Sequence, residues 1–224
     1  GFIIVFLILA ASGAAYFLLS SRGGEEPRPK LVPPTPFFAT ETSRTLEANT
    51  GDRTLFLRLM EDSLKEFERE GTIKRIAIKL RDGPRERFAA ADDFFELYRI
   101  TPPPGFLRTL EREFMAFVYY GRGGSRIGLA ARTRDAERTW RDLIMWESSL
   151  LRDFAPLFFD AKTEVVIAPF EDRTYRNIDW RFLKLSQSED LGIGYTVFPA
   201  GNVAVITTSK EAMETVIIRL FDNR

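Results

Sequence analysis

The sequence predicts an α+β domain with a mainly antiparallel sheet and helices packed on one face, placed after an N-terminal transmembrane helix and a proline-rich linker. Three observations lead to this prediction. Residues 2–21 carry no charge, five prolines fall within residues 27–36, and the remaining chain alternates helical and strand patterns irregularly, with hairpins instead of regular βαβ repeats. We therefore divide the chain into an anchor (1–21), a linker (22–44) and a globular domain (45–224).

The uncharged run has the length of a bilayer-spanning helix. Its twenty residues, Phe2–Ser21, would rise about 30 Å as a helix, which is the thickness of the hydrocarbon core. We expect further residues before Gly1, because the sequence does not begin with methionine. A pilin-type stem is the alternative, since Gly1-Phe2 resembles a prepilin cleavage junction. Pilins, however, carry glutamate at the position of Phe6, and Gly23-Gly24 interrupts a helix directly after the run.

Small residues gather in the middle of the predicted anchor. They are Ala10, Ala11, Gly13, Ala14 and Ala15. Residues of this size at four-residue spacing let two helices approach closely in lipid, which would make a homo-oligomer. The alternative is that they are the small residues that membrane helices ordinarily contain.

Composition limits the chemistry that these 224 residues can carry out. The 32 basic and 32 acidic residues balance, so no bulk charge favours nucleic acid, and we expect no nucleic-acid partner. Cysteine and histidine are both absent from the sequence. The chain therefore lacks disulfides, thiol chemistry, the usual general base and the commonest metal ligand. We expect no cofactor and no metal, with an all-oxygen calcium or magnesium site as the remaining alternative.

The first half of the domain begins with a predicted helix over residues 52–70. Its apolar stripe consists of Phe56, Met60, Leu64 and Phe67. A half-buried strand follows over residues 73–80, where apolar and polar residues alternate up to the turn at Asp82-Gly83. Residues 86–99 have a helical pattern, and a short helix through Leu110 follows the three prolines 102–104.

Residues 114–134 predict a β-hairpin, with the turn at Gly121–Ser125. This glycine-rich turn resembles a phosphate-binding loop superficially. Such a loop must join a strand to a helix, whereas this one joins two strands, so we interpret it as a tight turn.

The second half begins with a helix that Asp135 caps and that extends to Phe154. Its broad apolar stripe, with Trp146 at the edge, consists of Trp140, Leu143, Ile144, Glu147, Leu150, Leu151 and Phe154. Strands are predicted over 163–169, 177–185, 191–198 and 203–208. A capping-box pattern at residues 208–211 starts the final helix, which is expected to bury Ala212, Met213, Val216, Ile217 and Leu220.

Two kinds of charged cluster are candidates for a site. Adjacent carboxylates occur at Asp92-Asp93, Glu171-Asp172 and Glu189-Asp190, but general acid–base catalysis needs carboxylates that face each other, so we interpret these as surface residues. The second cluster is basic and consists of Arg122, Arg126, Arg132 and Arg134, the last three on one face of a strand. It is either a site for lipid head groups, an acidic polymer or a partner's carboxylates, or an ordinary solvated strand face.

The last third of the chain contains the runs FEDRTYRNIDWRFL (170–183), YTVF (195–198) and VITTSKEAM (205–213). Together with the anchor and the proline-rich linker, these runs resemble uncharacterised single-pass envelope proteins of small-genome candidate-phylum bacteria. The resemblance covers most of residues 90–220 and contains no catalytic motif. It implies a membrane-tethered domain on the extracytoplasmic side.

From these observations we expect a non-enzymatic, membrane-anchored cell-envelope protein that scaffolds or binds within a larger membrane assembly. The expected partners are the lipid bilayer and other membrane or envelope proteins, with a homo-oligomer as a further expectation. The alternatives are a pilin-like or pilus- or secretion-assembly subunit and a hydrolase that uses carboxylates with a divalent metal.

Overall fold

The computed structural model describes residues 31–159, 161, 163 and 169–223. The predicted anchor, its small-residue patch, most of the linker and most of the strand predicted over 163–169 lie outside these residues. Contacts divide the chain into two units, Gly1–Val32 and Pro33–Arg224, and all the elements below belong to the second. Among the described helices, none combines the length and apolar character that crossing a membrane requires.

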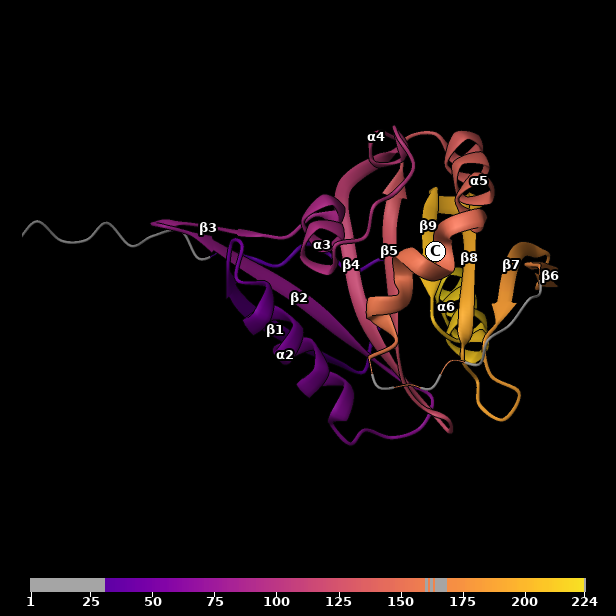
Figure 1. Ribbon diagram of the computed structural model, residues 1–224, viewed down its shortest axis with the longest axis horizontal. Coiled ribbons are helices and arrows are strands. Elements are labelled where there is room, and N and C mark those ends of the chain that lie inside the picture. The colour runs from indigo at the N-terminus through magenta and orange to yellow at the C-terminus, as the bar shows by residue number, and fades with distance from the viewer. Residues whose placement is uncertain (1–30, 160, 162, 164–168, 224) are drawn as a thin grey trace, which may run out of the picture. The chain divides into compact units, whose positions relative to one another are not determined.

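Nine strands of the described chain form one sheet, seen in Figure 1. In spatial order they are β1 (Thr42–Asn49), β2 (Thr72–Asp82), β4 (Leu110–Gly121), β5 (Gly124–Thr133), β9 (Val203–Thr207), β8 (Gly192–Phe198), β7 (Ile178–Lys184) and β6 (Glu171–Tyr175), with β3 (Arg85–Phe88) beside β2. The β1–β2 pair is parallel and the other pairs are antiparallel. The predicted α+β class with a mainly antiparallel sheet is therefore confirmed.

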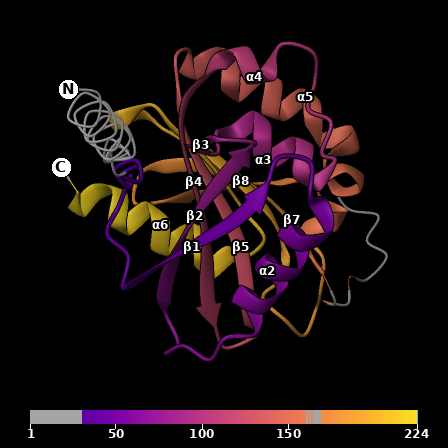
Figure 2. The ribbon, with the colours of Figure 1, turned by 90° about the vertical axis from the view of Figure 1, so that its left-hand side faces the viewer.

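Helices cover both faces of this sheet, so the expectation that they lie on one face is wrong. Figure 2 shows α6 (Lys210–Asp222) on one side and the other helices opposite, namely α2 (Arg53–Lys65), α3 (Ala91–Tyr98), α4 (Phe106–Thr109) and α5 (Ala136–Phe154). The cause is visible in β4, whose residues 114–120 are all buried. Side chains of a strand alternate between its two faces, so an unbroken apolar run needs a cover on each side.

The two covers define two hydrophobic cores. The α5-side core contains Phe56, Phe94 and Trp146, together with Ala116 and Val118 of β4. The α6-side core has its own set from the opposite face, which includes Phe38, Phe117, Val205, Met213 and Ile217. Each core buries residues from strands of both halves of the chain, and the sheet between them is shared.

Two predicted helices are shorter than the sequence indicates. The first, α2, ends at Lys65, and Phe67, which the stripe places in the core, is fully exposed. Lys74 of β2 holds the segment after α2 by ion pairs with Glu66 and Glu68, so this segment runs back to the sheet as a loop. The helix predicted over 86–99 begins at Ala91 instead, because the residues before it pair with β2 as the strand β3.

The helices α5 and α6 begin where the sequence predicts. Asp135 accepts a hydrogen bond from the backbone N of Arg138 at 2.9 Å, which confirms it as the cap of α5. In α6 the cap is Ser209, one residue after the Thr208 of the predicted capping box, and its Oγ accepts from the backbone N of Ala212 at 3.0 Å. The five residues expected to be buried in α6, Ala212, Met213, Val216, Ile217 and Leu220, are all buried.

The face that α5 turns to the core differs from the predicted stripe by about one position. Trp146, placed at the edge by the sequence pattern, is 1% exposed, whereas Ile144 is 40% exposed. Trp146 fits inside because its ring meets Phe106 and Phe154 and its Nε1 donates to Asp153 at 2.8 Å. The polar edge of the indole is thereby satisfied, as a buried tryptophan requires.

Candidate functional site

The segment before β1, residues 34–41, is packed against the domain, and we name it the strap. Phe37 and Phe38 are both buried in the α6-side core, and the Phe38 ring meets that of Phe117 edge-on at 5.4 Å. The predicted linker, 22–44, therefore extends too far into the domain, because β1 starts at Thr42. Burying one such aromatic side chain stabilises a fold by about 1.5–3 kcal/mol, enough to dock a short segment.

Polar contacts from the far end of the chain hold the strap in place. Arg219 of α6 donates to the carbonyl of Ala39 at 2.8 Å and to both carboxylate oxygens of Glu41 at 2.9 Å. Asn223 donates from Nδ2 to the carbonyl of Phe37 at 2.9 Å, and Arg75 of β2 donates to the carbonyl of Pro34. The bonds to Pro34, Phe37 and Ala39 are accepted by backbone carbonyls, so they fix the path of the strap and not only its side chains.

Glu41 is the electrostatic centre of this attachment. Its Oε2 also accepts from the backbone N of Ile73 at 2.8 Å. Burial opposes ionisation here, but hydrogen bonds from Arg219 and Ile73 outweigh it and hold the pKa of Glu41 below its usual value. The carboxylate is therefore ionised at neutral pH and ties the strap to α6 and β2 at once.

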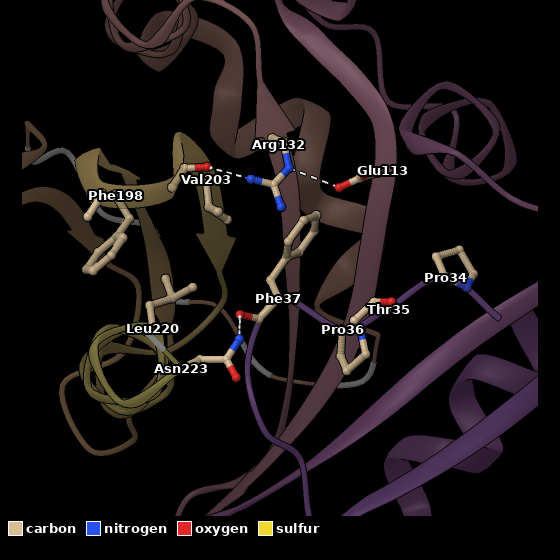
Figure 3. Close-up of a pocket in the computed structure, with 12 residues that line it drawn as sticks. Pro34, Thr35, Pro36, Phe37, Glu113, Arg132, Phe198, Val203, Leu220 and Asn223 are labelled. Atoms are coloured by element: carbon tan, nitrogen blue, oxygen red, sulfur yellow. Dashed lines mark hydrogen bonds and ion pairs between the residues drawn. The ribbon is translucent and has the colours of Figure 1, made fainter.

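A pocket of about 430 Å³ lies beside the strap, and we name it the strap pocket (Figure 3). The strap forms one wall and the β8–β9 turn with the end of α6 forms the other, whereas β4 and β5 contribute one polar corner. Its lining consists of Pro34, Thr35, Pro36, Phe37, Glu113, Arg132, Phe198, Ala200, Gly201, Val203, Leu220 and Asn223.

Arg132 is the basic residue of the strap pocket. Its Nε donates to Glu113 at 2.9 Å and its Nη1 to the carbonyl of Gly201 at 3.1 Å, while its guanidinium lies 5.5 Å from the centre of the Phe37 ring. Figure 3 shows the side chain reaching over that ring. A guanidinium stacked on an aromatic ring and paired on one side is held in place, and it still presents donors to a ligand.

The volume and lining of the strap pocket fit a short peptide segment. Small-molecule pockets measure about 300–1,000 Å³, so the volume is in the ordinary range. The accessible lining is more polar than apolar: Glu113, Arg132 and Asn223 supply polar groups, and Phe37, Val203 and Leu220 are largely buried. A short segment that offers hydrogen-bonding groups would match this lining.

The structure separates the four arginines that the sequence groups together. Arg132 lines the strap pocket, and Arg126 lies six residues before it on the same strand, which is about 20 Å at 3.3 Å per residue. Arg122 is in the turn and pairs with Glu70 at 2.6 Å, and Arg134 follows the end of β5. The predicted basic cluster is therefore not one surface.

Arg126 is buried, which removes it from any partner-facing surface. Its Nε donates to the carbonyl of Asp190 at 2.8 Å and its Nη2 to the carbonyl of Gly123 at 2.6 Å and to Glu189 at 3.1 Å. The alternation along the strand places Arg126 correctly on the face with Arg132. It does not reveal that the loop around Asp190 covers this end of the strand.

A second polar cluster, which the sequence does not predict, joins α5 to β7 and β8. Glu147 accepts from Tyr195 and from two nitrogens of Arg181, and Arg181 also pairs with Asp172. The hydrogen bond to Glu147 raises the pKa of Arg181, and burial, followed by the bond to Glu147, raises the pKa of Tyr195. A carboxylate on the apolar stripe of the predicted helix, Glu147, is the feature that indicates a buried partner.

The adjacent carboxylates also have structural partners. Asp190 accepts from the backbone N of Lys210 at 2.9 Å and of Glu211 at 3.0 Å, at the start of α6. Asp93 accepts from the backbone N of Ala90 at 2.9 Å and pairs with Arg87 through both oxygens. Anionic side chains at helix N-termini stabilise the helix, so these two acids act as caps.

Two results complete the description of the site. In the part of the chain that the structure describes, no three acidic side chains are grouped in a way that would hold a metal ion. Comparisons with protein-family models, curated proteins and solved structures find no match to this chain. The strap pocket is therefore the candidate site.

Proposed function

We propose that this chain is a non-enzymatic, membrane-anchored cell-envelope protein that binds or scaffolds other proteins of a membrane assembly. The observation that carries the proposal is the strap, the point where the predicted spacer joins the domain. In this proposal residues 2–21 lie in the bilayer and the domain lies on the extracytoplasmic side. Other envelope proteins, and further copies of the chain through the anchor, are the proposed partners.

The strap supports a scaffolding role because it gives the domain a fixed point of attachment. The predicted spacer before it, residues 22–32, reaches about 34 Å if extended at 3.1 Å per residue. From Pro34 onward the chain is bound to α6 and β2, so the strap belongs to the domain and the tether ends at a defined point on it. A defined attachment point is what a tethered assembly component requires.

The strap pocket supports a binding role because it lies at that attachment point. Its polar lining and the stacked Arg132 can receive a short segment of a partner, with Phe37 of the strap in one wall. Binding there would contact the strap directly. The pocket would therefore connect partner binding to the path of the chain toward the membrane.

Two of the partly buried acidic residues bind other parts of the domain, which supports a role without catalysis. Glu147 accepts hydrogen bonds from Arg181 and Tyr195, and Asp190 accepts from the α6 backbone. These groups hold elements together, which is what a binding domain requires of them.

A pocket-filling substitution tests the proposal. Ala200 is exposed and lines the strap pocket, so Ala200→Trp should fill the pocket without removing a hydrogen bond. The full chain would be recovered from detergent-solubilised membranes with its bound proteins, which mass spectrometry would identify. Thr45→Trp, at an exposed position of β1 outside the pocket, is the matched control.

The proposal predicts partners that copurify with the unmodified chain and with Thr45→Trp and that are lost from Ala200→Trp. Both variants should keep the thermal midpoint of the unmodified chain. An identical set of proteins with all three chains would contradict a binding role for the strap pocket. Recovery of the full chain in the soluble fraction without detergent would contradict the membrane anchor.

A further inference from the structure

The outward side of α5 carries arginines around two exposed apolar residues. Met145 is 63% exposed and Ile144 is 40% exposed, and they are neighbours on this helix. Residues at spacings of three and four share one helical face. We name the resulting surface the α5 outer face, and it consists of the exposed residues Glu137, Arg138, Arg141, Ile144, Met145, Ser148 and Arg152.

The structure makes this face basic although α5 as a sequence is slightly acidic. Its nineteen residues contain three arginines and four acids. Three of those acids are turned inward: Asp142 is buried, with its Oδ2 lacking a hydrogen bond among the described residues, Glu147 pairs with Arg181, and Asp153 accepts from Trp146 and Ser149. Only Glu137 remains exposed on this helix, so the exposed charges are three positive and one negative.

The three arginines differ in how firmly they are paired. Arg138 lies 3.9 Å from Asp142 and Arg152 lies 3.2 Å from Asp153, and the side chains of both arginines are more than half exposed. In each pair only the Nε of the arginine lies near the acid, so the other nitrogens of the guanidinium stay open to a second anion. The guanidinium groups are therefore available to phosphates.

We propose that the α5 outer face docks on an anionic lipid surface. The arginines would bind lipid phosphates, which a guanidinium can grip at two points, and Ile144 with Met145 would enter the boundary between head groups and acyl chains. This inference rests on the membrane anchor of the proposed function and adds a second, reversible contact with the bilayer.

The strength of the interaction favours a bilayer over an acidic protein. Each basic residue near an anionic membrane contributes about 1 kcal/mol, and two half-exposed apolar side chains add little more. A free partner would bind such a face too weakly to remain. A bilayer within about 34 Å of the strap, the reach of residues 22–32, acts at high effective concentration, so weak contacts suffice.

A single fluorescent probe in reconstituted vesicles tests this inference. The chain has no cysteine, so Ser148→Cys allows an environment-sensitive dye to be placed on the α5 outer face alone. The full chain would be reconstituted in phosphatidylcholine vesicles with and without phosphatidylglycerol. Asp222→Cys, exposed at the end of α6 on the opposite face of the sheet, is the matched control.

The inference predicts that dye emission at position 148 shifts to the blue in phosphatidylglycerol vesicles only and that high salt reverses the shift. The triple variant Arg138→Gln, Arg141→Gln and Arg152→Gln should lose the shift while keeping its melting midpoint. Emission at position 222 should be the same in both lipids.

Equal emission at position 148 in the two lipids would overturn the inference, as would a shift that appears only after an acidic protein is added. Flotation of the same vesicles separates this result from the proposed function. If the chain floats but the dye does not respond, the docking fails and the anchor stands. If the chain does not float, the anchor itself fails.

Discussion

Lys74, Arg126 and Arg181 show how single charged residues enter the interior of this domain. Lys74 is 5% exposed and pairs with Glu66 and Glu68. Burial alone would lower the pKa of Lys74, but hydrogen bonds to these carboxylates raise it above its usual value. A buried charge is tolerated when its partners are in place, and removing a partner is strongly destabilising.

Glu41 leads to a prediction about pH. Its pKa is lower in the folded domain than its unfolded value of about 4.3, so its contribution to stability is present above that value and is lost as the pH falls through the folded pKa. Glu41→Gln should therefore lower the free energy of unfolding at pH 7. The difference from the unmodified chain should shrink as the pH falls below about 4. Urea unfolding of both chains at pH 7 and pH 3 measures this difference in unfolding free energy.

The control for this prediction is Glu70→Gln, since Glu70 pairs only with the exposed Arg122 in the described residues. Its unfolding free energy should match that of the unmodified chain at pH 7. If the unfolding free energies of Glu41→Gln and the unmodified chain differ by the same amount at pH 7 and pH 3, the ionised Glu41 carboxylate does not stabilise the domain.

At the scale of elements, the pattern of apolar residues predicts most of the fold. The hairpin of β4 and β5, the helix α5 and the helix α6 form where expected, because each has its own local pattern and cap. The unbroken apolar run 114–120 also indicates that both faces of the sheet are covered, although our one-faced expectation did not use it. The strand β3 was mistaken for helix because its residues Glu86 and Arg87 are good helix formers, although the segment pairs with β2 directly across the turn at residues 83–84.

The strap illustrates what sequence reasoning about elements cannot reach. Its prolines predict an extended linker. The strap has no helix, but Phe37 and Phe38 are buried against residues far along the chain. Arg219 lies 178 positions after Glu41, and no local pattern connects them. Of the predicted basic residues only Arg132 belongs to the strap pocket, since membership depends on where the strap docks.

Phe38→Ala tests whether docking of the strap stabilises the folded domain. Removing a buried aromatic ring costs roughly 3–5 kcal/mol, so the denaturant midpoint should fall. Phe67→Ala makes the same chemical change at a fully exposed position of the domain and should leave the midpoint unchanged. Urea unfolding of both variants, followed by tryptophan fluorescence, gives the comparison. Equal midpoints for the two variants would show that the strap adds no stability.

At the scale of the whole domain, the strap and α6 bring the two ends of residues 33–224 together. The strap crosses the α6-side face before β1 forms one edge of the sheet, and contacts with α6 hold it there. Docking of the strap therefore needs α6 in place. The attachment to the predicted spacer and the strap pocket both depend on this closure.

Hydrogen–deuterium exchange of the full chain in lipid nanodiscs tests this closure most directly. We expect the backbone amide of Glu41, which donates to the carbonyl of Ile73, to exchange as slowly as the amides of β4 and β5. Arg219→Ala should make this amide exchange faster while the β4–β5 amides stay protected. If the Glu41 amide of the unmodified chain exchanges as fast as those of the exposed turn between β2 and β3, the strap is not part of the domain and the proposed closure is wrong.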